Sequence, residues 1–129
     1  MPYQLKTSKS NKMQLKLQDI LNASEALKQI AGKELPSKLG YQLSRLQFKI
    51  QEPLKAFDTS RNELIKKYGV EQEDKTIKVS DENMPKFYEE LNGIVQTEEV
   101  LEFNPININL FEGNFSKEFF ILMDKFITE

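Results

Sequence analysis

A single apolar stripe runs through the middle of the sequence, and it constrains the fold more than any other feature. Its members recur every three or four residues, the period of a helix with one buried face; they are Leu39, Leu43, Leu46, Ile50, Pro53, Phe57, Arg61, Leu64 and Tyr68. A helix of about thirty residues is roughly 50 Å long at 1.5 Å per residue. The stripe therefore predicts one long helix, with Pro36 in its first turn and Gly69 as its C-terminal cap.

Pro53 interrupts this stripe in its middle. A proline inside a helix cannot donate to the carbonyl four residues earlier, here that of Lys49, and its ring crowds the preceding turn. The apolar spacing continues past Pro53 through Phe57 and Leu64, which favours one continuous, kinked helix. Two helices broken at Glu52 are the alternative.

A shorter helical pattern precedes the long helix. Its apolar and small residues share one face, and they are Leu17, Ile20, Leu21, Ser24, Leu27, Ile30 and Ala31. Gly32 fits the position just after a helix end. A short helix joined to a long one by a tight Gly–Pro connection predicts an α-hairpin.

The second half of the chain mixes strand and helix signals. After an acidic loop with Glu71, Glu73 and Asp74, short strands are predicted at 76–79 and 100–103, with an alternating, extended edge piece over 106–110. Ser80 or Asp81 is expected to cap a helix that ends at Val95. Ser116 is expected to cap a terminal helix whose buried face contains Phe119, Leu122 or Met123, Phe126 and Ile127.

These elements predict a mostly helical α+β fold. An α-hairpin with one long, Pro53-kinked helix packs against a small sheet of two or three strands and two short helices. Residues 1–14 are expected to be a flexible, basic N-terminal arm, because they bury little, and residues 15–129 a single α+β domain. The arm supplies three candidate interaction residues: Lys6, Lys9 and Lys12.

Composition excludes several kinds of chemistry. The 129 residues include no cysteine and no histidine, so disulfides, thiolate metal sites and Ser-His-Asp triads are ruled out. The carboxylate pairs Glu89-Glu90 and Glu98-Glu99 lie in polar sequence that would not raise a pKa for acid catalysis. We therefore assign no catalytic, cofactor-binding or metal-binding residue and expect no enzyme activity. No apolar run is long enough for a membrane span or a signal peptide, so we expect a soluble protein.

The net charge of −2 hides a strong asymmetry. Residues 1–67 contain 13 Lys or Arg and 6 Asp or Glu, a net charge of +7, whereas residues 68–129 contain 5 and 14, a net charge of −9. Such halves can fold onto each other, stack head to tail between copies, or present one sign to a partner. The alternative is that these charges simply lie on solvated polar faces and have no such role. Because arginine is scarce and aromatics are not interleaved with the lysines, nucleic acid is not the expected partner.

Phe119 and Phe120 are adjacent near the C-terminus of a chain with nine phenylalanines. Neighbouring side chains on a helix point in different directions, so both rings are not expected to enter one small core. The pair is therefore a candidate contact surface for a protein partner or a homo-oligomer. Packing inside the core is the alternative.

Three stretches of the chain resemble a family of small, uncharacterised bacteriophage proteins: ILNASEAL, KELPSK and LIKKYG. The matching positions are Leu21, Asn22, Ala23, Ala26, Leu27, Lys33, Glu34, Leu35, Pro36, Lys38, Tyr41, Arg61, Leu64, Ile65, Tyr68 and Gly69. The later run KFYEELNGIVQTEEVLEFNPININ is similar to another segment of that family, so the resemblance covers residues 15–110. Pro53 departs from it, since the family has a helix former there.

The resemblance implies a bacteriophage gene product and implies no activity. Together with the composition, it leads us to expect a non-enzymatic protein of the host cytoplasm or the virion. Such a protein would act through protein–protein contacts as a virion or assembly component, with itself or other phage proteins as partners. A phage inhibitor or modulator that binds a host protein or nucleic acid is the alternative.

Overall fold

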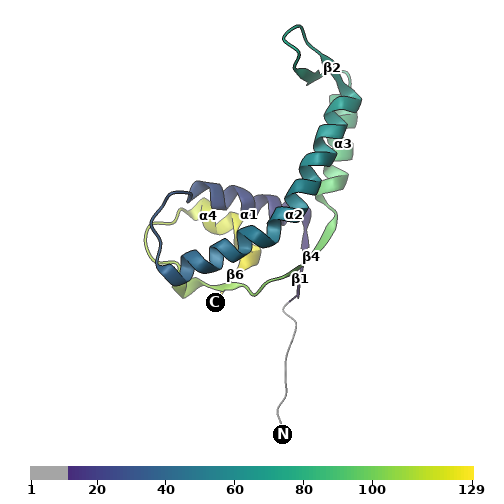
Figure 1. Ribbon diagram of the computed structural model, residues 1–129. Helices are drawn as coiled ribbons and strands as arrows, with labels where there is room; N and C mark the ends of the chain where they lie inside the picture. Colours follow the sequence, from purple (N-terminus) through teal and green to yellow (C-terminus); the bar gives the residue numbers. More distant parts are fainter. Residues whose placement is uncertain (1–11) are drawn as a thin grey trace.

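The computed structural model describes residues 12–129 and confirms a mostly helical α+β fold (Figure 1). Lys6 and Lys9 lie outside the described residues. The elements in chain order are β1 (Lys12–Lys16), α1 (Leu17–Gln29), α2 (Ser37–Tyr68), β2 (Gly69–Glu71), β3 (Ile77–Val79), α3 (Met84–Val95), β4 (Glu98–Glu102), β5 (Ile106–Asn107), the 3₁₀ turn η2 (Ile108–Leu110), α4 (Lys117–Leu122), the 3₁₀ turn η3 (Asp124–Phe126) and β6 (Ile127–Thr128).

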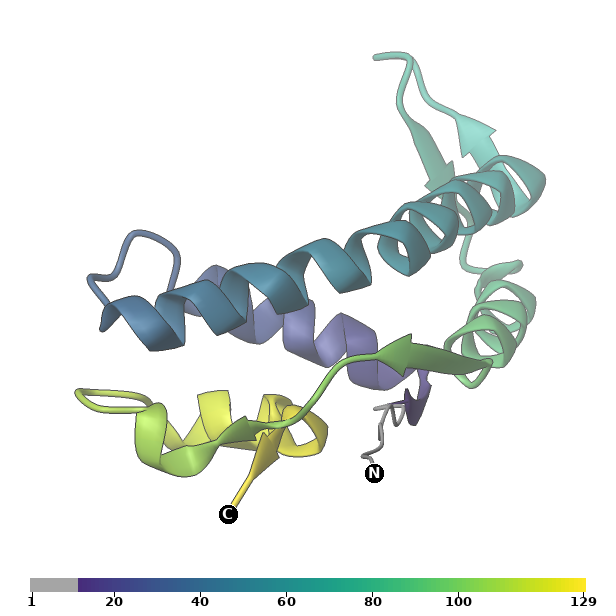
Figure 2. The same ribbon diagram turned by 60° about the horizontal axis from the view of Figure 1, so that its bottom comes forward.

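The α-hairpin is confirmed. Helix α1 packs on the first half of α2, and Gly32 in their connection has a φ of +83°, a left-handed conformation that glycine adopts without strain. The C-terminal segment closes the other side of this pair (Figure 2). We call this part of the molecule the body. Its buried core consists of Leu15, Leu17, Ile20, Ala23, Ala26, Leu39, Leu43, Leu46, Ile50, Leu101, Phe103, Ile106, Phe119, Met123 and Phe126.

Helix α2 continues through Pro53, as the apolar spacing predicts. Pro36 precedes its first residue with a φ of −54°, which suits a helix start. The helix bends in its middle (Figure 1), where Pro53 removes one backbone donor and crowds the preceding turn. The bend turns the second half of α2 away from the body.

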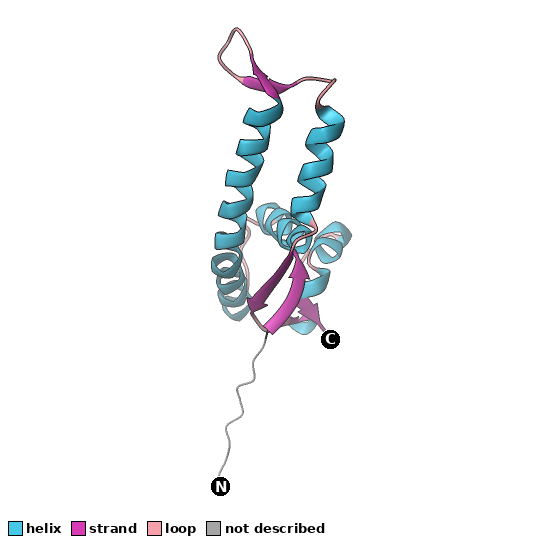
Figure 3. Cartoon of the chain, turned by 90° about the vertical axis from the view of Figure 1, so that its right-hand side faces the viewer, coloured by secondary structure: helices cyan, strands magenta, loops and turns pink. Residues whose placement is uncertain are grey.

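The second half of α2 and helix α3 form a projecting stalk, which we define as residues 56–95. The two helices run side by side, with the β2–β3 hairpin at the far end (Figure 3). A separate small core holds the stalk together, and its buried residues are Leu64, Val79 and Phe87. The expected cap at Ser80 or Asp81 is wrong, because Asn83 is the N-cap of α3; the Ser80 hydroxyl instead accepts a hydrogen bond from the Asn83 backbone nitrogen at 3.3 Å in the turn before the helix.

One expectation for the segment after α2 is confirmed and one is wrong. Gly69 is the C-terminal cap of α2, as expected; its φ of −94° and ψ of 162° are extended, and it is also the first residue of strand β2. Glu71 belongs to the same strand and pairs with Ile77 of β3, so the expected acidic loop is a hairpin. Val70 is the one β-branched residue in this three-residue strand, and that signal is too short to predict a strand.

Strands β1 and β4 pair in an antiparallel ladder, which joins the two chain segments that form the body. Lys12 lies opposite Glu102 and Lys16 lies opposite Glu98, so opposite charges face each other across the pair. The basic and acidic halves of the chain therefore meet here. This pairing also corrects the boundary of the expected N-terminal arm, because residues 12–14 belong to the domain.

The strands form three separate two-stranded pairs within residues 12–129, where one small sheet was expected. Strand β5 pairs in parallel with β6, and residues 108–110 form a 3₁₀ turn rather than an extended edge. The Asn107 side chain accepts a hydrogen bond from the backbone nitrogen of Asn109 at 2.8 Å, which starts this turn. Ser116 caps α4 as expected, since its hydroxyl accepts from the backbone nitrogen of Phe119 at 3.0 Å.

Candidate interaction surface

Ionisable groups lie at the surface of residues 12–129, where every buried side chain is apolar. In this range, no three carboxylates gather into a group that could hold a metal ion. No helix of the same range is long and apolar enough to cross a membrane. The candidate functional features of the described chain are therefore its exposed faces.

One polar cluster ties the two helices of the stalk together. The Lys67 Nζ lies 3.1 Å from a carboxylate oxygen of Glu90, and the Tyr68 hydroxyl donates a hydrogen bond to the same oxygen. The hydrogen bonds from Tyr68 and then Lys67 lower the pKa of Glu90, and the bond to Glu90 raises the pKa of both donors. The cluster joins Lys67 and Tyr68, at the end of α2, to Glu90 of α3, so it holds α3 against α2.

Phe119 is wrong as a surface contact residue. Its side chain is 1% exposed, because it faces the body core together with Met123 and Phe126. Its ring centroid lies 4.9 Å from that of Phe115, inside an aromatic cluster that Phe111 and Phe120 complete. The core-packing alternative is therefore correct for Phe119.

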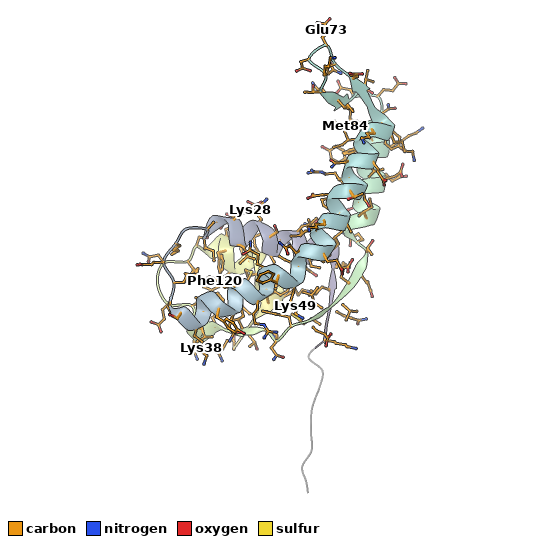
Figure 4. All side chains as sticks on the ribbon, viewed as in Figure 1. Lys28, Lys38, Lys49, Glu73, Met84 and Phe120 are labelled. Carbon is orange, nitrogen blue, oxygen red and sulfur yellow. The ribbon has the colours of Figure 1, made fainter. Side chains whose placement is uncertain are left out.

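Phe120 and Lys12 lie on different elements and do not form a joint surface. Phe120 (labelled in Figure 4) is half-buried, with its ring 5.8 Å from that of Phe111, so it covers the edge of the aromatic cluster. Lys12 is exposed on β1, opposite Glu102.

The sequence did not lead us to predict an exposed aromatic pair on α2. Tyr41 is 63% exposed and Phe48 is 74% exposed, and their spacing of seven residues places them on one side of the helix. Lys38, Arg45 and Lys49 are exposed around them on the same side. We call these five residues the α2 face. The signal was present, since Tyr41 and Phe48 are large apolar residues that lie off the buried stripe. The expectation that aromatic residues are not interleaved with basic ones is therefore wrong for this face.

The hairpin at the end of the stalk has an exposed apolar residue on each of its two faces, beside acidic residues. Val70 is 55% exposed and Ile77 is 41% exposed, and they lie on opposite faces because Val70 pairs with Lys78 whereas Glu71 pairs with Ile77. Glu71, Glu73 and Asp74 surround them, and all three are exposed. We call these five residues the hairpin tip. The Asp74 carboxylate accepts hydrogen bonds from the backbone and the hydroxyl of Thr76 at 3.1 and 2.6 Å, which lowers its pKa and closes the turn.

A groove of about 650 Å³ runs between α1 and α2 beside their connection. Its apolar lining includes Leu27, Leu43, Ile50 and Leu54. Lys28 and Lys33 also line it, and the Lys33 ammonium lies 4.6 Å from the centre of the Phe115 ring. The groove thus has apolar walls and basic residues beside them.

Comparison of the chain with protein-family models, with curated proteins and with solved structures finds no match.

Proposed function

We propose that this protein is a non-enzymatic bacteriophage component that acts through protein–protein contacts, in the virion or during its assembly. The supporting observation is the α2 face, with Phe48 the most exposed of its large apolar side chains. Tyrosine, phenylalanine and arginine are enriched at protein interfaces, because they bury much area and retain polar or charged groups.

The bent shape supports the same proposal. The stalk projects from the body, so its hairpin tip can reach a partner without displacing any body contact (Figure 1). The assignment to a bacteriophage rests on the sequence resemblance alone and stays a prediction.

Photo-crosslinking tests the proposal. Benzoylphenylalanine placed at position 48 should form covalent adducts with phage structural proteins, or with this protein itself, in infected cells. The matched control is the same group at position 121, where Ile121 is 64% exposed on α4, outside the α2 face. Mass spectrometry of the adducts identifies the partner.

The alternative is a phage modulator that binds a host protein, and the acidic hairpin tip is the observation in its favour. A projecting acidic hairpin fits a basic cleft on a host enzyme. Adducts from position 48 that contain only host proteins would support this alternative and contradict the assembly role.

A further inference from the structure

We propose that the hairpin tip of one copy docks on the α2 face of a second copy, so that the protein assembles head to tail. This inference rests on the proposed function and names its partner. It follows from the chemistry of the two surfaces and from their positions on the two arms of the bent molecule.

The α2 face is positively charged. Residues 37–55 contain four Lys or Arg and one Glu, a net charge of +3. Tyr41 and Phe48 are the apolar centre of this face, and Lys38, Arg45 and Lys49 stand beside them. Figure 4 shows Lys38 and Lys49 projecting from the first half of α2. The face has an aromatic centre and a mainly basic border, with the carboxylates of Glu52, Glu99 and Glu102 beside Lys49 at one end.

The hairpin tip has the complementary pattern. The whole hairpin, residues 69–79, contains three acidic residues and two lysines, a net charge of −1, and Lys78 lies opposite Val70, on the other face from Glu71 and Ile77. Glu71 and Ile77 lie opposite each other in the β2–β3 register, so one side of the hairpin presents an apolar group next to a carboxylate. Glu73 lies at the far end of the hairpin (Figure 4). Apolar contact in the centre and opposite charges around it are the pattern of a specific protein interface.

The two surfaces of one molecule cannot meet each other. About 40 Å of helix at 1.5 Å per residue separates Tyr41 from Tyr68, where the hairpin starts. The bend in α2 points the stalk away from the first half of the helix (Figures 1 and 3). Because different surfaces meet in each contact, the assembly is heterologous and forms a ring or an open filament.

Mixing two damaged variants is the test. The variant Phe48→Glu has an intact hairpin tip and a damaged α2 face. The double variant Val70→Ser with Ile77→Ser has an intact α2 face and a damaged hairpin tip. Sedimentation of the wild-type protein should show species larger than a dimer. Each variant alone should be a monomer, with an association constant lowered at least about tenfold. An equimolar mixture should form a dimer and nothing larger, because one intact tip meets one intact face.

A charge exchange gives an independent readout. Arg45→Glu with Lys49→Glu should weaken association, and so should Glu71→Lys with Glu73→Lys, whereas mixing these two variants should restore it. The control Ile121→Ser changes an exposed apolar side chain outside both surfaces and should leave assembly unchanged. Circular dichroism confirms that each variant is folded, as expected for changes at exposed positions.

Three results would overturn the inference. The first is a wild-type protein that sediments as a monomer at every accessible concentration. The second is a mixture of the two damaged variants that stays monomeric. The third is an α2 face that binds a single-stranded oligonucleotide, together with a tip variant that associates as the wild-type protein does. If position 48 still crosslinks to a different phage protein, the proposed function stands and only the choice of a second copy as partner fails.

Discussion

Leu46 and Phe48 lie two residues apart on α2 and point into opposite environments. Leu46 is fully buried between the helices of the body, whereas Phe48 is 74% exposed. The buried stripe and the exposed aromatic pair thus occupy opposite sides of one helix.

This contrast predicts opposite mutational costs. Leu46→Ala should lower the free energy of unfolding by about 2–5 kcal/mol, because it leaves a cavity in a packed core. Phe48→Ala should change it by less than about 0.5 kcal/mol. Denaturant unfolding of the monomer measures both, and equal costs at the two positions would contradict the assignment of the two sides.

Pro53→Ala should restore the missing backbone hydrogen bond to the carbonyl of Lys49. The free energy of unfolding should stay the same or rise by up to about 3 kcal/mol, the difference between alanine and proline inside a helix. If Pro53 causes the bend in α2, the helix should also straighten. The chain has no cysteine, so labels at Lys38→Cys and Glu73→Cys report the distance between the body and the hairpin tip. That distance should grow in the alanine variant, and an unchanged distance would mean that packing holds the bend.

Gly69→Ala should destabilise the stalk by about 1–3 kcal/mol, the usual effect of forcing extra volume into a packed place. A Cβ at this position would overlap the carbonyl oxygen of Ile65 and the side chain of Ile77. Gly93→Ala is the matched control in α3, where a Cβ meets no atom within 4 Å. It should stabilise the protein by about 0.5–1 kcal/mol, because alanine favours a helix interior. Thermal unfolding of both variants checks the opposite signs.

Tyr68→Phe should raise the pKa of Glu90 towards its ordinary value of 4.5, since the hydroxyl hydrogen bond is the main cause of its lowered pKa. A group with a lowered pKa stabilises the fold above its unfolded pKa and loses this contribution as the pH falls through its folded pKa. The stability difference between wild type and Tyr68→Phe should therefore be full at neutral pH and shrink below pH 4.5. Carboxyl NMR of Glu90 gives the pKa directly. Tyr88→Phe, at an exposed tyrosine of α3, is the control and should leave that pKa unchanged.

The sequence predicted features that depend on local periodicity. The stripe through Leu64 identified α2 as one helix past Pro53, and Ser116 identified the start of α4, because both signals lie within a few residues of the structure they determine. The core stripe is confirmed at Leu39, Leu43, Leu46, Ile50 and Leu64, which are all buried. Arg61 is exposed, so the stripe is interrupted there and is buried again at Leu64 in the stalk core.

The sequence did not predict features that depend on distant partners. Lys12 pairs with Glu102, and β5 pairs with β6, across separations that no local pattern encodes. The placement of Phe119 failed for a similar reason. Its neighbour Phe120 covers the edge of the same aromatic cluster, so a small core accommodates two adjacent rings when one of them lies at its border.

The base of the stalk, where α2 and β4 line a small cavity of about 230 Å³, has a topological consequence. Pro53 and Leu101 both line this cavity, so the chain leaves the body and returns to it at neighbouring points. The buried residues of the body core come from residues 15–50 and 101–126, on either side of the stalk. In architectural terms the stalk is inserted between the two segments of the body, which close on each other through β1 and β4. Closing a longer or shorter loop at the same two points changes little free energy, so a change in the length of the stalk should leave the fold of the body intact.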